Sequence, residues 1–138
     1  MAALFRDGRL VTTAAVAVRA GRYFLARRKS EGAQSLRWEF PGGKCDDDGD
    51  ERRCLEREFA EEFGVTVSVA EELGSVPFEH AGTRYMLVGY RVEIPPVPLE
   101  LREHVEAGWF LPGEVLQLDL ADSDRSLVQH ILPACPDQ

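Results

Sequence analysis

The sequence predicts a mixed α/β or α+β sandwich in which short strands and three helices share one core. Short β-like runs occupy most of the chain, one helical repeat of apolar residues lies near its centre, and turn dipeptides separate the runs. The 138 residues, 44% of them hydrophobic and 29% charged, suffice for a globular domain with a sizeable core. Because no internal repeat or linker divides the chain, we expect residues 1–138 to form a single domain.

The strands are expected to be mostly antiparallel. Ala20-Gly21 joins the first two as a hairpin, and Ala81-Gly82 joins the fifth and sixth. The third ends at Pro41, which two glycines follow. In chain order, the strands are predicted at residues 12–19, 22–28, 37–40, 65–70, 73–80, 84–92 and 106–111.

The central helix is predicted at residues 51–63. Apolar residues recur every four positions along it and give it one buried stripe, formed by Leu55, Phe59 and Phe63. Gly64 supplies its C-terminal stop, and Asp48 or Asp50 its N-cap. Two shorter helices are expected at residues 112–116, where a proline begins the helix, and at residues 123–131.

Charge and hydropathy exclude several classes of protein. With 24 acidic and 16 basic residues, the net charge of −8 repels a polyphosphate backbone, so long nucleic acid is a poor partner. A small anionic ligand remains compatible if divalent metal mediates its contact. No run approaches the roughly 18 apolar residues of a membrane span, and charged residues interrupt the apolar N-terminus, which argues against a signal peptide.

The three cysteines, Cys45, Cys54 and Cys135, are an odd and unpatterned set without zinc-type spacing. This usage predicts free thiols in a reducing compartment rather than a disulfide framework. We therefore expect a cytoplasmic protein.

Three glutamates on the central helix suggest a metal site. Glu58, Glu61 and Glu62 stand at i, i+3 and i+4, so they share one face beside the apolar stripe, and Glu51 projects the same way two turns earlier. Like charges at this spacing repel, whereas clustered carboxylate oxygens are the ligands that Mg²⁺ or Mn²⁺ requires. Arg57 can pair with a neighbouring acid. Taken alone, paired glutamates are more often a solvated helix face.

The wider stretch at residues 43–65 decides between these interpretations, because it resembles the Nudix box, G-x5-E-x7-R-E-U-x-E-E-x-G-U, where U is apolar. All but one of the fixed positions match: Gly43, Arg57, Glu58, Phe59, Glu61, Glu62, Gly64 and Val65. The resemblance implies the Nudix fold, a mixed β-sheet sandwiched between α-helices, and hydrolysis of a nucleoside diphosphate linked to another group.

One position of the box departs from the pattern. Its first glutamate falls on Gly49, and Asp50 and Glu51 follow directly. In the family this glutamate orients the box arginine, so we expect Asp50 or Glu51 to substitute for it. Residues 46–48, all aspartate, are expected to form a solvated loop, with an accessory metal role as the alternative.

Outside the box the chain is similar to MutT-type nucleoside triphosphate pyrophosphohydrolases, including oxidised-purine and CTP-cleaving members. The similarity extends over nearly the whole chain. Its markers are WEFPGGK at residues 38–44, LARR ending at Arg28, an EHxxxxW spacing at Glu103, His104 and Trp109, and LADSDRSLV at residues 120–128.

This resemblance implies a metal site for two or three Mg²⁺ ions, with Mn²⁺ as an alternative. The implied ligands are the Gly42 carbonyl with the side chains of Glu58, Glu61, Glu62 and Glu103. Glu58 or Glu103 would take a proton from the attacking water, and Arg57 would support the carboxylates. Glu106 is the alternative to Glu103.

The resemblance also implies a substrate site. Arg28 and Lys44 would offer positive charge to phosphates, although Arg28 could equally be an exposed strand-end charge. Glu39 and Phe40 would line a nucleobase pocket, and Asp124 would face the base. As an ionised carboxylate, which only accepts hydrogen bonds, Asp124 would favour guanine or cytosine over uracil. The alternative for Asp124 is a helix N-cap.

The function implied is metal-dependent hydrolysis of a nucleoside triphosphate to a nucleoside monophosphate and pyrophosphate. This would be either MutT-like sanitising of the nucleotide pool, as with 8-oxo-dGTP, or a CTP or dCTP pyrophosphohydrolase. Two alternatives stay open: a Nudix hydrolase of ADP-ribose or a dinucleoside polyphosphate, and a non-catalytic module that senses nucleotides. The sequence leaves the preferred base and the oligomeric state open.

Overall fold

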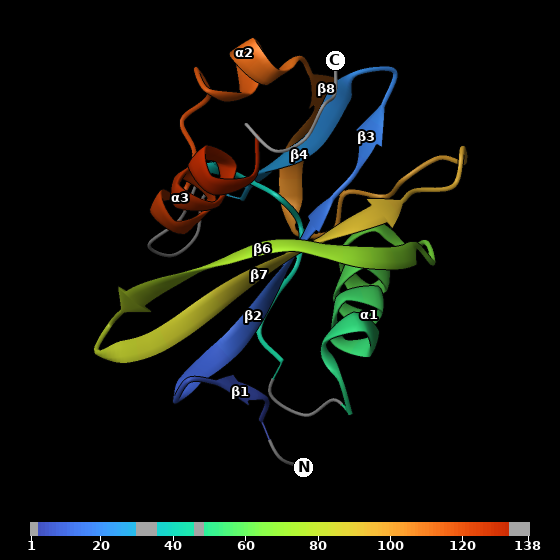
Figure 1. Cartoon of the computed structure of the whole chain (residues 1–138). Helices are drawn as coiled ribbons and strands as arrows, with labels where there is room; N and C mark the ends of the chain where they lie inside the picture. Colours follow the sequence, from blue (N-terminus) through green and yellow to red (C-terminus); the bar gives the residue numbers. More distant parts are fainter. Residues whose placement is uncertain (1–2, 30–35, 46–48, 133–138) are drawn as a thin grey trace.

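The computed structural model describes residues 3–29, 36–45 and 49–132 (Figure 1). Its strands are β1 (Phe5–Arg6), β2 (Arg9–Val16), β3 (Val18–Arg19), β4 (Arg22–Arg28), β5 (Trp38–Glu39), β6 (Ser68–His80), β7 (Thr83–Glu93) and β8 (His104–Phe110). Its helices are α1 (Glu51–Phe63), α2 (Pro112–Val115) and α3 (Asp122–Ile131). This mixture of strands and helices confirms the predicted fold class.

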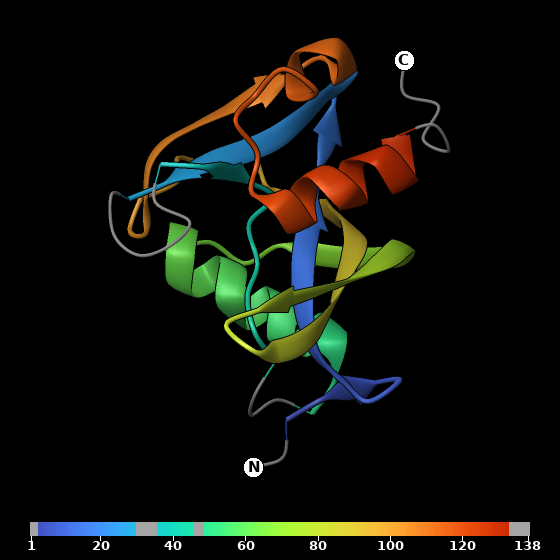
Figure 2. The same cartoon turned by 90° about the vertical axis from the view of Figure 1, so that its left-hand side faces the viewer.

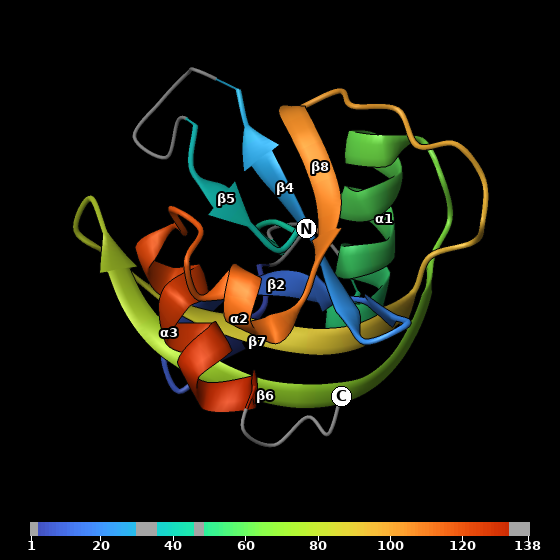
Figure 3. The ribbon, with the colours of Figure 1, turned by 90° about the horizontal axis from the view of Figure 1, so that it is seen from above.

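The described strands form two sheets. One has the order β1-β2-β7-β6, and in the other β4 pairs with β3, β5 and β8. The pair β2–β7 is parallel and the remaining described pairs are antiparallel, as expected for most of the strands. Seen from above, the long β6–β7 hairpin curves beneath β4, β5 and β8 (Figure 3).

Helices α1 and α3 cover opposite faces of the β1-β2-β7-β6 sheet, because the central strands of that sheet are apolar on both sides. Along β2, Ala15 belongs to a buried cluster with Phe59 of α1, whereas Val16 belongs to a second cluster with Leu127 of α3. Successive strand residues point to opposite faces, so the alternation assigns each face to one helix. Figure 1 shows α3 and α1 on either side of β2, and Figure 2, viewed from the side of α3, has that helix in front and α1 behind.

Helix α1 has the bounds that its sequence predicts. The side chain of Asp50 accepts a hydrogen bond from the Arg53 amide at 2.8 Å, which confirms it as the N-cap. Gly64 adopts a left-handed conformation with φ of 76°, and its amide donates to the Ala60 carbonyl. The predicted stripe is fully buried, so α1 is fixed firmly against the sheet.

Strand boundaries differ from the prediction where the backbone is irregular. The separate strands expected at residues 65–70 and 73–80 form one strand, β6, and shifts of register on either side of Glu72 absorb the irregular stretch as bulges. The strand expected at residues 12–19 is divided into β2 and β3, and the two-residue β1 was not predicted. Both predicted hairpin turns are present, with positive φ at their two central residues.

The prediction of free thiols is wrong for two cysteines, because Cys45 and Cys54 form a disulfide. The reason is tertiary: the Cys45 amide donates to the Val11 carbonyl, which holds this residue on β2 beside the first turns of α1. The two Cα atoms thereby lie 5.5 Å apart. Cys135 lies outside the described residues, as do residues 46–48 and the expectations for them. The expected cytoplasmic location loses the support of free thiols.

None of the described helices has the length and apolar character needed to cross a membrane.

The disulfide predicts a dependence of stability on redox state. Cross-linking residues nine positions apart restricts the unfolded chain, so the oxidised protein should be more stable than the reduced protein by about 2–3 kcal/mol. Urea unfolding of protein refolded with and without dithiothreitol measures the difference. A Cys45→Ala/Cys54→Ala variant serves as the control and should give the same curve in both conditions. Identical curves for the wild-type protein would contradict the disulfide.

Candidate active site

The three box glutamates of α1 differ steeply in exposure. The side chain of Glu61 is 60% exposed and that of Glu58 is 17% exposed, whereas residue Glu62 is only 6% exposed. This gradient follows from the position of the carboxylate face beside the apolar stripe. The predicted location beside the apolar stripe is therefore confirmed for Glu58 and Glu62, whereas the Glu61 side chain is mostly in solvent.

Arg57 holds two of these carboxylates in place. Its Nη1 donates to Glu58 at 2.9 Å and to Glu61 at 3.3 Å, and its Nη2 donates to the Lys44 carbonyl at 3.5 Å. The expected pairing of Arg57 with a neighbouring acid is confirmed, and the same guanidinium also contacts the loop before α1.

The expectation that Asp50 or Glu51 orients the box arginine is wrong. Asp50 caps the helix, and Glu51 accepts hydrogen bonds from Arg6 at 2.7 Å and from the Tyr90 hydroxyl at 2.6 Å. Glu51 lies in the first turn of α1, where its carboxylate meets β1 and β7 instead of the other box residues. It therefore supports the fold rather than the carboxylate cluster.

The loop between β5 and α1 lies against β2, and glycine is required there. The amides of Thr13 and Ala15 donate to the carbonyls of Gly43 and Pro41, at 2.9 and 2.7 Å. Gly42 has φ of 155°, and a Cβ atom on it would overlap the Thr13 carbonyl. Its own carbonyl oxygen makes no hydrogen bond with any described residue. A Cβ atom on Gly43 would overlap Glu58, so the loop and this carboxylate are in direct contact.

Glu62 is the site carboxylate whose ionised form is least favourable. Burial, together with the negative charges of Glu39 and Glu58, raises its pKa to about 9. Its Oε1 is buried and has no hydrogen-bond partner among the described residues. A divalent cation would supply the positive charge that is missing there, and the oxygen donors nearby are those that Mg²⁺ and Mn²⁺ prefer. The residues present therefore fit such an ion.

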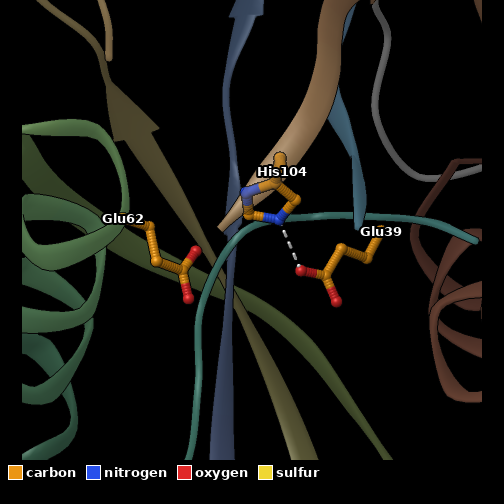
Figure 4. A group of neighbouring side chains, drawn as sticks. All are labelled: Glu39, Glu62 and His104. Carbon is orange, nitrogen blue, oxygen red and sulfur yellow. Dashed lines mark hydrogen bonds and ion pairs between the residues drawn. The ribbon is translucent and has the colours of Figure 1, made fainter. Parts of the chain in front are cut away.

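A second group of side chains joins Glu62 from other elements. Glu39 of β5, Glu62 of α1 and His104 of β8 bring one potential ligand atom each within 4.8 Å of the others (Figure 4). His104 Nε2 lies 2.9 Å from Glu39 Oε2, which also accepts from Arg28 Nη1 at 3.1 Å. His104 was noted in the sequence only as part of the EHxxxxW spacing, and no role was assigned to it.

A cavity of about 350 Å³ extends from this group toward α3 and the end of the β6–β7 hairpin. All the residues predicted to bind substrate line it: Arg28, Glu39, Phe40, Lys44 and Asp124. Gly42 and Gly43 also line it, and Phe78, Tyr85 and Leu87 add apolar surface that the sequence did not indicate. The rings of Phe78 and Tyr85 are stacked, with centroids 4.9 Å apart, and the Lys44 ammonium lies 5.6 Å from the centroid of the Tyr85 ring. The cavity thus combines charged side chains with flat apolar rings.

Asp124 is not the N-cap of α3, because that helix begins at Asp122 and Ala121 occupies the N-cap position. Its Oδ1 instead accepts a hydrogen bond from the Phe40 amide at 3.0 Å. Burial, with the negative charge of Glu39 nearby, raises the pKa of Asp124 well above its ordinary value. This shift makes ionisation of Asp124 less favourable, so it does not support the expected ionised carboxylate.

Glu103 directly precedes β8 and Glu106 lies within it, and the two side chains have different surroundings. Glu103 is exposed, and its negative charge contributes to raising the pKa of Glu62, so it lies near the box carboxylates. Glu106 forms an ion pair with Arg27 at 3.5 Å, on the neighbouring strand. Of the two acids, Glu103 has the position closer to the site.

The two tryptophans belong to the core. Trp38 is buried and packs edge-on against Phe110, with ring centroids 5.2 Å apart. Trp109 is half-buried and packs against Phe24, also at 5.2 Å. Neither lines the cavity.

The fold and this arrangement define a Nudix hydrolase. Residues 8–131 match the family model described as the NUDIX domain. The chain belongs to the Nudix family.

Its relatives point to enzymes that act on nucleotides. The chain is 35% identical over 119 residues to the CTP pyrophosphohydrolase of Escherichia coli K12, covering 86% of this chain and 88% of that one. It is 30% identical over 124 residues, 88% of this chain and 86% of the other, to a Mycobacterium tuberculosis H37Rv protein named provisionally as 8-oxo-dGTP diphosphatase 2. The solution structure of the E. coli ORF135 protein superposes with a TM-score of 0.79 at 32% identity, covering 94% and 95% of the two chains.

The raised pKa of Glu62 predicts a pH-dependent stability of the metal-free protein. The folded-state pKa of about 9 exceeds the ordinary value of 4.5, so stability is lost as pH rises between these values. Glu62→Gln should therefore raise the free energy of unfolding at pH 8, in EDTA, by about 2 kcal/mol or more. Urea unfolding at pH 5 and pH 8 measures this, with the exposed Glu61→Gln as the control. An unchanged pH dependence in Glu62→Gln would contradict the assignment.

Proposed function

We propose that this Nudix hydrolase cleaves nucleoside triphosphates to nucleoside monophosphates and pyrophosphate, using Mg²⁺ or Mn²⁺. The observation that carries the proposal is a single cavity lined by the cationic side chains of Arg28 and Lys44 and by aromatic rings with Asp124. The box carboxylate Glu58 lies directly beside Gly43, which lines the same cavity. A nucleotide likewise combines a charged phosphate chain with a flat base. The names of the relatives at 30–35% identity support the reaction class.

The metal would be held by oxygen ligands around the C-terminal half of α1. We assign the Gly42 carbonyl and the carboxylates of Glu58, Glu61, Glu62 and Glu103 to this role. A divalent ion bound there would neutralise phosphate charge and lower the pKa of an attacking water. It would also make the local charge positive in a protein whose net charge of −8 otherwise repels an anionic substrate.

The protein's own side chains would bind the phosphates and accept the proton. Arg28 and Lys44 line the cavity and would contact the phosphate chain. Glu58 is held by Arg57 against the Gly43 loop, so it is oriented to accept a proton from water, and Glu103 is the alternative base. Water would attack the β-phosphorus and break its bond to the oxygen bridging the α- and β-phosphates. The leaving group is the nucleoside monophosphate, and the water oxygen ends in pyrophosphate.

The base would lie between Phe40, Asp124 and the β6–β7 hairpin. Glu39 contributes a carboxylate that accepts hydrogen bonds. This acceptor favours a base edge with an exocyclic amino group, such as that of cytosine or an oxidised guanine, over uracil. We therefore place CTP, dCTP and 8-oxo-dGTP first among the substrates.

The carboxylate assignment predicts a loss of turnover from conservative substitutions. Glu58→Gln and Glu62→Gln keep the shape of the side chain but remove its charge, so kcat should fall by about 100-fold or more. Pyrophosphate release in Mg²⁺ measures this, with circular dichroism to check folding. Glu56→Gln is the matched control, since Glu56 is exposed on the same helix and is not a fixed box position. Near-wild-type rates in either active-site variant would refute the assignment.

The reaction predicts a particular product and label. A panel of CTP, dCTP, 8-oxo-dGTP, UTP and ADP-ribose, assayed in H₂¹⁸O with Mg²⁺, should give pyrophosphate from the favoured triphosphates, with the label in pyrophosphate. UTP should be cleaved more slowly because its edge lacks the exocyclic amino group of cytosine. Label in the monophosphate would contradict attack at the β-phosphorus. Preferential cleavage of ADP-ribose, or no cleavage at all, would replace the proposed function with one of its alternatives.

A further inference from the structure

His104 is a buried titratable residue to which the proposed reaction assigns no role. It is 3% exposed and begins β8, directly after Glu103. In the register of the sheet it lies opposite Arg28 of β4. It therefore lies beside the strand that carries Arg28 and close to both Glu39 and Glu62.

The His104 ring is held by the element that carries the box carboxylates. It stacks on Phe63, the neighbour of Glu62 on α1, with centroids 5.1 Å apart and an interplanar angle of 11°. The loop before β8 is also hydrogen-bonded to this end of α1, through the Arg102 amide and the Glu62 carbonyl at 3.2 Å. The position of the imidazole is thereby tied to that of Glu62.

The polar partner of His104 is Glu39, which lines the cavity. Glu39 Oε2 accepts from Arg28 and contacts His104 Nε2 at 2.9 Å, so two donors hold one oxygen. Glu39 Oε1 makes no hydrogen bond with any described residue. Figure 4 shows the imidazole between Glu62 and Glu39, with the dashed contact to Glu39. This arrangement leaves Oε1 for a ligand.

The tautomer of His104 distinguishes a positioning role from metal binding. Its Nδ1 is buried and has no hydrogen-bond partner in the described part of the chain. If Nε2 bound a metal, the ring proton would have to reside on Nδ1, where it would have no acceptor. Histidine ligands normally donate their second N–H to such an acceptor. When the proton is on Nε2, the ring donates it to the Glu39 carboxylate. Nδ1 then carries only a lone pair, and no N–H group is left without an acceptor.

We propose that His104 is a positioning residue that holds the Glu39 carboxylate toward the nucleobase and fixes it relative to Glu62. This inference rests on the proposed function, since it assumes that Glu39 contacts the base. Without the imidazole, Glu39 would be held by Arg28 alone, and the two could turn together toward the phosphates. His104 thus sets substrate affinity and base selectivity by acting through Glu39.

Two substitutions separate the hydrogen bond from the packing. His104→Phe keeps a ring to stack on Phe63 but removes the donor, whereas His104→Gln retains an N–H donor at about the same reach. His104→Phe should raise KM for the preferred triphosphate by about 10-fold, with kcat within about 3-fold of wild type. His104→Gln should restore KM to within about 3-fold. The ratio of kcat/KM between CTP and UTP should fall in His104→Phe.

A double-mutant cycle with Glu39→Gln tests whether His104 acts through Glu39. The His104→Phe/Glu39→Gln protein should bind α,β-methylene CTP no more weakly, by calorimetry, than Glu39→Gln alone. Additive losses, a fall in kcat at constant KM, or weaker Mn²⁺ binding in His104→Phe would overturn the proposal. The wild-type protein in the nucleotide panel tests the proposed function separately, and the calorimetric cycle does not depend on turnover. Thermal unfolding monitored by circular dichroism verifies that each variant is folded.

Discussion

The structure depends on the burial of one carboxylic acid, Glu62, near the end of a helix among groups of like charge. A lone carboxylate in this position is unfavourable, and the raised pKa of Glu62 expresses that cost. The cost is tolerated only if the helix cannot move away, and α1 is fixed by its buried stripe, its caps and the disulfide to the preceding loop. A cation bound beside Glu62, as proposed above, would offset this cost.

The two-sided burial of β2 explains why the site forms where it does. Small residues such as Ala14 and Ala15 let both cores approach this strand closely, and the loop at residues 41–43 lies directly along it. Because successive residues alternate, the carbonyls of Pro41 and Gly43 bind β2 and that of Gly42 is directed elsewhere. A side chain at Gly42 would collide with the Thr13 backbone. The Gly42 carbonyl is thus left without a hydrogen bond to the described residues, while its two neighbours anchor the loop to β2.

The features that could be predicted from sequence are those encoded by short-range spacing. The bounds of α1, the Gly64 stop and the shared face of the glutamates depend on neighbours within a few turns, and the box spacing supplied the family. The missed features join residues far apart in the chain. Glu51 meets Arg6 across 45 positions, and Asp124 meets the Phe40 amide across 84. No local pattern indicates whether an aspartate caps its own helix or binds a distant strand. The hydrogen bond and the raised pKa of Asp124 could therefore be recognised only in the folded structure.

Glu39 links Glu62 and Asp124 electrostatically. Its negative charge contributes to the raised pKa of Glu62 on one side and of Asp124 on the other. A cation beside Glu62 would offset the negative charges that raise the pKa of Glu62, whereas ionisation of Asp124 would add a further negative charge near Glu39. Interactions of this kind are reciprocal, so the protonation state of Asp124 and the affinity for the cation proposed above would be coupled. The donors Arg28 and His104 on one oxygen of Glu39 keep this coupling in a fixed geometry. Under the proposed function, base recognition and phosphate chemistry would share one charge network.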